Sequence, residues 1–133
     1  MRIFILDDDE FRVSLVRRDF GRENVVWATT VREALTQLRN PIEKFDYIML
    51  DHDLGGPFTE GPGGDGIKVA KIMAQEYLHR DTIVICHSFN PVGRKNMIET
   101  LKHTHFVLEY PFGEHLRQWL KEYGPKVPGI KEK

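Results

Sequence analysis

Five short apolar runs, separated by segments with helical spacing of apolar residues, constrain the fold of this chain most strongly. The runs cover residues 2–6, 24–28, 46–50, 82–86 and 105–109. Runs rich in β-branched residues and without polar alternation are typical of strands buried on both faces of a parallel sheet. The order strand, helix, strand, helix therefore predicts an α/β fold, a single doubly wound five-stranded parallel sheet with strand order 2-1-3-4-5.

Capping residues mark where several of the helices begin. Thr30 is expected to cap a helix over 31–39, with Glu33 as the partner in a capping box. Asp65 is expected to cap a helix over 66–78. Asn90 precedes Pro91, a pattern that predicts an N-cap followed by proline at the first helical position. Two further helices are expected over 10–20 and 113–123.

Chain length and composition indicate one domain with no need for a metal or a disulfide to fold. The chain has 133 residues and a formal net charge of −1, so no overall field draws it to nucleic acid or membrane. We expect one domain over residues 1–123 and a flexible tail over 124–133, which contains two prolines and two glycines.

The cysteine content and the hydropathy pattern favour a cytoplasmic protein. Cys86 is the one cysteine, and its apolar surroundings predict a buried packing residue without a disulfide-linked partner. No apolar run approaches the length of a membrane span, so we expect no membrane partner. The apolar start, residues 1–6, is too short for a signal peptide.

Polar residues follow the predicted strands where parallel sheets of this type bind ligands. Because the carboxyl ends of parallel strands meet at one edge, we expect these side chains to share a pocket. They are Asp7, Asp8 and Asp9 after the first strand, Asp51, His52 and Asp53 after the third, His87, Ser88 and Asn90 after the fourth, and Tyr110 after the fifth.

Carboxylates brought together repel one another unless a positive charge joins them. We expect Asp7, Asp8, Asp9 and Asp51 to hold a divalent cation, with Mg²⁺ or Mn²⁺ favoured by oxygen ligands. The alternative is that the first three aspartates only cap the following helix and that Asp53 only forms a turn.

Other residues near this edge admit two interpretations each. His87 is a metal ligand or general acid/base, or else a hydrogen-bonded core histidine. His52 either supports the site or is structural. The glycine-rich loop 55–66 either approaches a phosphate or is a surface loop, and Arg94 and Lys95 either bind an anion or are solvated. The remaining histidines, for which exposed or edge positions are expected, are His79, His103, His105 and His115.

The acidic triplet, Asp51 and the pair Pro111-Phe112 resemble a two-component receiver domain. The resemblance implies that the acidic pair holds Mg²⁺ and that Asp51 accepts a phosphoryl group. Two positions depart from the receiver pattern. His87-Ser88 stands where receivers have a serine or threonine, and Tyr110 stands where they have the lysine that stabilises the added phosphoryl charge.

A longer resemblance is to the cyclic-phosphate-processing receiver domains, a family within the receiver superfamily. It extends from residue 2 to about 112 and implies action on cyclic phosphates, such as RNA 2′,3′-cyclic phosphate ends. The motifs that carry it are Leu6-Asp7-Asp8, Leu50-Asp51-His52-Asp53-Leu54-Gly55 and His87-Ser88-Phe89-Asn90-Pro91-Val92-Gly93-Arg94, with Met97 further on.

The leading hypothesis from the sequence is a metal-dependent phosphoesterase that opens a cyclic phosphate on a nucleotide or RNA terminus. Its catalytic residues would be His87, Asp51 and Asp53, with the metal on Asp7, Asp8, Asp9 and Asp51. Its phosphate-binding residues would be Ser88, Asn90, Arg94 and His52. Two rival hypotheses stay open, a signalling module phosphorylated on Asp51 and a non-catalytic module that binds a nucleotide or a partner.

Overall fold

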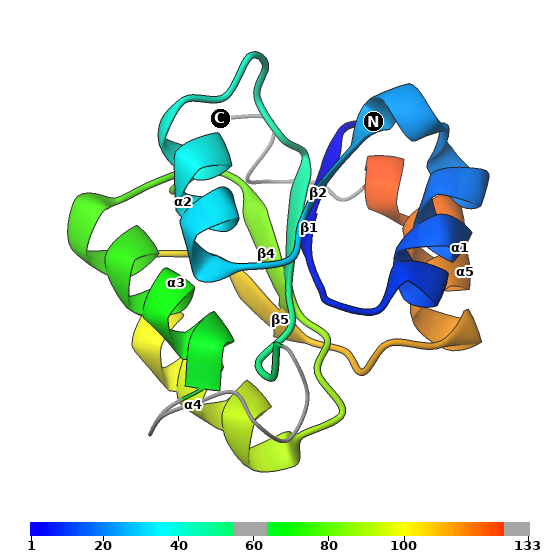
Figure 1. Cartoon of the computed structure of the whole chain (residues 1–133). Coiled ribbons are helices and arrows are strands. Elements are labelled where there is room, and N and C mark those ends of the chain that lie inside the picture. Colours follow the sequence, from blue (N-terminus) through cyan, green and yellow to red (C-terminus); the bar gives the residue numbers. More distant parts are fainter. Residues whose placement is uncertain (55–63, 127–133) are drawn as a thin grey trace.

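A computed structural model describes residues 1–54 and 64–126 of the chain. Five parallel strands form one sheet in the order β2-β1-β3-β4-β5, as predicted (Figure 1). The strands are β1 (Ile3–Leu6), β2 (Val25–Ala28), β3 (Tyr47–Leu50), β4 (Ile83–Cys86) and β5 (Val107–Glu109). The helices are α1 (Glu10–Phe20), α2 (Val31–Arg39), α3 (Gly64–Glu76), α4 (Pro91–Leu101) and α5 (Glu114–Glu122).

Helices cover both faces of the sheet, and the strand residues alternate between two cores. Phe4, Leu6, Ile48 and Leu50 belong to the core shared with α2, α3 and α4. Their neighbours Ile3, Ile5 and Met49 belong to the core shared with α1 and α5. Figure 1 shows the two helical layers on opposite sides of the sheet. This alternation explains why the strands read as continuous apolar runs, since every second side chain enters the other core.

Two of the predicted caps are confirmed. The Thr30 side chain accepts a hydrogen bond from the backbone N–H of Glu33, and α2 begins at the next residue, Val31. The Asn90 side chain accepts from Gly93 N–H at 3.0 Å, and Pro91 is the first residue of α4. Cys86 is fully buried, and burial raises the pKa of its thiol to about 12, so its predicted role in packing is confirmed.

The prediction for α3 was wrong at both ends. The helix begins at Gly64, so Asp65 lies in its first turn rather than at the cap. The helix ends at Glu76 because Tyr77 and His79 adopt positive φ angles of 55° and 53°, which a right-handed helix cannot contain. Residues 55–63 of the glycine-rich loop lie outside the described residues.

The segment after α5 starts with a short 3₁₀ turn, Gly124–Lys126. The Tyr47 hydroxyl donates a hydrogen bond to the Gly124 carbonyl oxygen at 2.7 Å, which ties this turn to β3. The rest of the predicted tail, residues 127–133, lies outside the described residues. Within the described residues, no helix combines the length and the apolar character needed to cross a membrane.

Candidate functional site

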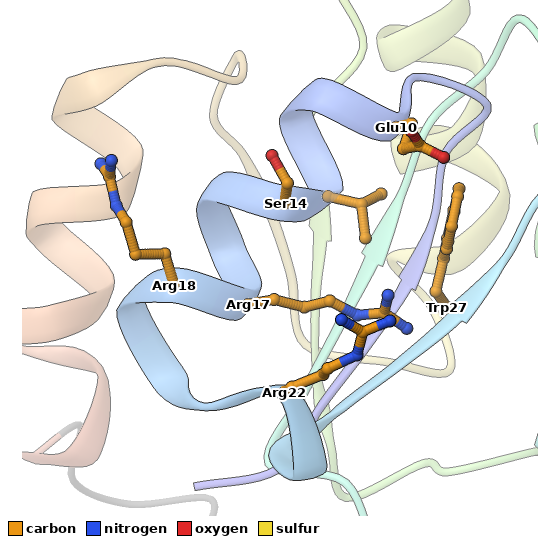
Figure 2. A pocket seen from close by; sticks show the side chains of 7 residues that line it. Glu10, Ser14, Arg17, Arg18, Arg22 and Trp27 are labelled. Atoms are coloured by element: carbon orange, nitrogen blue, oxygen red, sulfur yellow. The ribbon is translucent and has the colours of Figure 1, made fainter.

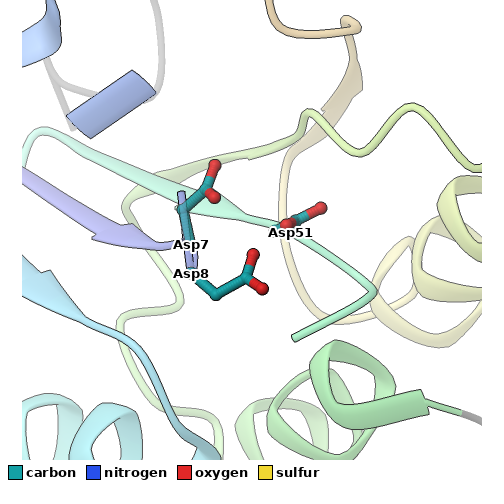
Figure 3. A group of neighbouring side chains, drawn as sticks. All are labelled: Asp7, Asp8 and Asp51. Atoms are coloured by element: carbon teal, nitrogen blue, oxygen red, sulfur yellow. The ribbon is translucent and has the colours of Figure 1, made fainter. Parts of the chain in front are cut away.

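Three carboxylates meet at the carboxyl ends of β1 and β3. The parallel register pairs Leu6 with Leu50, so Asp7 and Asp51 emerge at the same height. Asp7, Asp8 and Asp51 each offer an oxygen within 4.8 Å of the other two (Figure 3). Asp7 and Asp51 are buried, whereas Asp8 is exposed. The expectation that acids from the first and third strands share one place in the fold is therefore met.

Asp9 lies outside this group of three ligand oxygens. Its side chain accepts from the backbone N–H of Arg12 at 3.1 Å and so caps α1. Its own N–H donates to Asp7 Oδ1 at 2.8 Å, which fixes the turn between β1 and α1. Asp9 thus takes the capping role that the sequence left open as the alternative.

Arg12 supplies a positive charge to the carboxylates, and sequence reasoning missed it. Its Nη2 donates to Asp7 Oδ1 at 2.9 Å and to Asp51 Oδ2 at 3.4 Å. The guanidinium lies 5.3 Å from the ring centre of Phe89 and 5.9 Å from that of Phe112. A basic residue in the first turn of a helix that follows an acidic triplet is a signal that could have identified it.

His87 lies beneath the carboxylates with no exposed surface. Its Nε2 is 2.9 Å from Asp7 Oδ2, and an ionised carboxylate can only accept, so Nε2 donates this bond. Its Nδ1 has no hydrogen-bond partner in the part of the chain that the structure describes. The ring meets that of Phe112 edge-on, with 5.9 Å between the ring centres. The histidine therefore holds the Asp7 carboxylate in place through a buried hydrogen bond.

The two buried carboxyls have pKa values shifted in opposite directions. Burial alone would raise the pKa of Asp7, but the hydrogen bond and charge of His87, together with Arg12, lower it below its ordinary value. Burial raises the pKa of Asp51 to about 6, and the charge of Asp7 adds to this rise. Asp51 is thus the carboxyl of the pair whose charge is less stabilised by the protein.

His52, Asp53 and Asn90 form a small hydrogen-bonded network beside Asp51. His52 Nδ1 lies 2.8 Å from Asp53 Oδ1, and Asn90 Nδ2 donates to Asp53 Oδ2 at 3.3 Å. The ring of His52 packs under Gly93, where an added Cβ would overlap the imidazole. The network joins the β3–α3 and β4–α4 connections, so these residues hold the rim of the site in place.

Ser88 and Arg94 contact each other rather than the carboxylates. Arg94 Nη1 donates to the Ser88 carbonyl oxygen at 2.6 Å, and its Nε donates to Glu109 Oε2 at 2.8 Å. Ser88 is buried, and its Oγ accepts from Asn90 N–H at 3.1 Å. In this arrangement both residues secure the start of α4, and Lys95 is exposed.

Tyr110 packs in the core shared with α1 and α5, where its ring centre lies 6.2 Å from that of Trp119. It brings no charge to the site, so Arg12 is the side chain that places a cation next to Asp51.

His105 was expected to be exposed or at an edge, but it is buried. Its Nε2 lies 2.6 Å from the Leu78 carbonyl oxygen, a partner far away in the sequence.

Comparisons with known structures agree with this fold. The receiver domain of the Francisella response regulator 1452 superposes with a TM-score of 0.60 at 23% identity, and 93% of each chain is covered. The phosphorylated cyanobacterial phytochrome response regulator RcpA gives 0.64 at 22% identity, with 96% of each chain covered. The beryllofluoride-activated NtrC4 receiver domain gives 0.62 at 21% identity, covering 92% of this chain and 94% of that one.

The sequence comparisons identify the family more narrowly than the fold does. No curated protein matches this sequence at a significant level. The family described as the cyclic-phosphate processing receiver domain matches residues 1–103, which include the carboxylates, Arg12, His87 and the start of α4. The chain therefore belongs to the cyclic-phosphate processing receiver domain family.

Proposed function

We propose that this chain is a receiver-type module that accepts a phosphoryl group on Asp51. The observation that carries the proposal is the placement of Asp51 at the end of β3, between two further carboxylates and the guanidinium of Arg12. The signalling hypothesis gives a role to all of these groups, whereas the phosphoesterase hypothesis that the sequence favoured gives none to Arg12.

The three carboxylates fit a divalent cation. Their oxygens lie within 4.8 Å of one another, and hard oxygen ligands suit Mg²⁺ or Mn²⁺. Asp7, Asp8 and Asp51 would hold the ion, with Asp9 excluded by its role as a cap. When bound, such an ion offsets the negative charges of the carboxylates and of an incoming phosphate.

Arg12 offers a positive charge in place of the lysine that receivers have at the position of Tyr110. In the transfer, an oxygen of the Asp51 carboxylate bonds to phosphorus, and the bond from phosphorus to the leaving oxygen of the donor breaks. The phosphoryl oxygens then need positive partners, and the Arg12 guanidinium already lies 3.4 Å from Asp51 Oδ2. Arg12 would therefore take the charge role for which the sequence offered no candidate.

Processing of a cyclic phosphate is a second candidate, supported by the description of the matching family. Water would bond to phosphorus and release a proton to the solvent, one ring P–O bond would break, and His87 would give a proton to the departing ribose oxygen. The roles predicted for Asp53, Ser88, Asn90, Arg94 and His52 belong to this candidate. It requires His87 to become accessible, because the side chain has no exposed surface and is bound to Asp7.

Two assays on the same purified protein separate these candidates. Incubation with acetyl phosphate and Mg²⁺ should add one phosphoryl group by intact mass, and Asp51→Asn should abolish it. Incubation with a 2′,3′-cyclic nucleotide and Mg²⁺ or Mn²⁺ should leave the nucleotide intact. Ring opening that Asp51→Asn and His87→Asn both abolish, without mass addition, would replace the first candidate by the second. A location in the cytoplasm and a nucleotide or RNA partner stay predictions from the sequence.

A further inference from the structure

A pocket lies on the other side of α1 from the α5 helix, against the edge strand β2 (Figure 2). Its volume is about 540 Å³, within the range of small-molecule sites. None of its lining residues belongs to the carboxylate group described above. The pocket is lined by Glu10, Val13, Ser14, Arg17, Arg18, Arg22 and Trp27.

Arg17 is held in the pocket by an aromatic contact. Its guanidinium lies 5.3 Å from the ring centre of Trp27. The Trp27 Nε1–H donates to the Asp7 carbonyl oxygen at 2.7 Å, so the ring itself is fixed. The Nε of Arg17 is buried and has no hydrogen-bond partner among residues 1–54 and 64–126. A guanidinium held in place by an aromatic ring is preorganised to bind an anion.

Three arginines and one acidic residue, Glu10, line the pocket, so positive charge is in excess there. Figure 2 shows Arg17 and Arg22 both extending toward Trp27, with Arg18 on the other flank of α1 and Glu10 at the opposite end of the pocket. Across the described part of the chain, no ion pair with an acid joins these arginines. By contrast, Arg39, Arg94 and Arg117 each lie against a carboxylate. Two guanidinium groups that share a pocket repel each other unless an anion joins them.

We propose that this pocket binds the phosphate group of a nucleotide. The forked donors of Arg17 and Arg22 match phosphate oxygens, which they can bind in pairs. The partly exposed ring of Trp27 offers apolar surface to the organic part of a phosphate ester. The proposal is independent of phosphorylation at Asp51, because Asp7, Asp8 and Asp51 do not line this pocket.

The two indole N–H groups of the protein allow the site to be observed directly by ¹⁵N NMR. Titration with adenosine 5′-monophosphate at constant ionic strength should shift the Trp27 indole signal in a saturable manner and leave that of Trp119 unchanged. Adenosine should produce no saturable shift, and inorganic phosphate should bind more weakly than the nucleotide. Equal affinity for inorganic phosphate would overturn the nucleotide assignment, and no saturable shift with either anion would overturn the site.

Matched variants separate binding in the pocket from a general charge effect. Arg22 is exposed, so R22Q should keep the fold and weaken nucleotide binding about tenfold. R17Q should weaken it at least as much. R80Q removes an exposed arginine that also stacks on an aromatic ring, Tyr77 at 5.7 Å, and should leave the affinity unchanged. An equal loss in R80Q and R22Q would show unspecific attraction and contradict the proposal.

Discussion

His87 Nε2 donates a hydrogen bond to Asp7 Oδ2 at 2.9 Å, and neither side chain is exposed to solvent. The bond crosses from β4 to β1 and holds one carboxylate of the site in its ionised form. Asp51, on the strand between them, receives less support, so the site contains one carboxylate that is fixed and one that responds to its surroundings.

Asp51→Asn should stabilise the protein at neutral and alkaline pH. The pKa of Asp51 is raised from 3.8 to about 6, so ionising it in the folded state costs stability. The cost is absent below the unfolded pKa, grows as pH rises toward 6 and stays constant above it. The variant should gain about 1–3 kcal/mol at about pH 8 and little at about pH 4. Urea unfolding at both pH values measures this difference, and an equal effect at the two would contradict it.

Arg12→Ala should destabilise the protein and strengthen the binding of Mg²⁺. Removing the guanidinium takes a hydrogen-bonded cation away from Asp7 and Asp51, which should cost about 1–3 kcal/mol. The same loss removes a charge that repels a metal ion, so calorimetry should show an affinity for Mg²⁺ higher by about tenfold. Arg80→Ala, far from the carboxylates in the fold, is the control. A weaker affinity for Mg²⁺ in Arg12→Ala would contradict competition between Arg12 and the ion for the carboxylates.

Gly66→Ala should disturb the site and destabilise the protein, even though alanine has the higher helix propensity. An added Cβ would overlap the Asp51 carbonyl oxygen and lie 2.8 Å from His52 Cα, and neither backbone atom can move without shifting the end of β3. We expect a loss of about 1–3 kcal/mol in thermal unfolding together with weaker Mg²⁺ binding. Gly113→Ala is the control, because its Cβ would meet nothing within 4 Å, and its cost should be below about 1 kcal/mol.

His105 should stay neutral at pH values where an exposed histidine is half charged. Burial lowers the pKa of His105 below 6.5, and the nearby charges of His79 and Arg80 act in the same direction. Since the unfolded chain takes up this proton more readily, the histidine reduces stability as pH falls below 6.5. NMR titration of the imidazole checks the pKa, and R80Q should raise it. A midpoint at or above the ordinary value would contradict the burial argument.

The sheet could be predicted because its signals are local in the sequence. The strand at 46–50 shows in its own composition, and Thr30 and Asn90 cap helices through bonds to residues three positions away. The convergence of Asp7 and Asp51 followed from topology alone, since β1 and β3 are parallel neighbours. These features need no knowledge of side-chain orientation.

The contacts of the charged side chains could not be predicted in the same way. Arg12 donates a hydrogen bond to Asp51, which lies 39 positions away in the sequence. Arg94 donates to Glu109 and not to the carboxylates of the candidate site. Each of these choices depends on which carboxylate lies nearest once the sheet has formed. His105 was misjudged for the same reason, because the carbonyl of Leu78 that permits its burial is 27 positions away.

The pairing of Leu6 with Leu50 has a consequence for how this domain can change over evolutionary time. A slip of one residue between β1 and β3 would turn Asp51 toward the opposite helical layer and separate it from Asp7. Substitutions on the outer surfaces of the helices leave that pairing intact. Descendants of this sequence could therefore acquire new surfaces and new partners while the spacing of their acidic oxygens is inherited unchanged from the ladder beneath them.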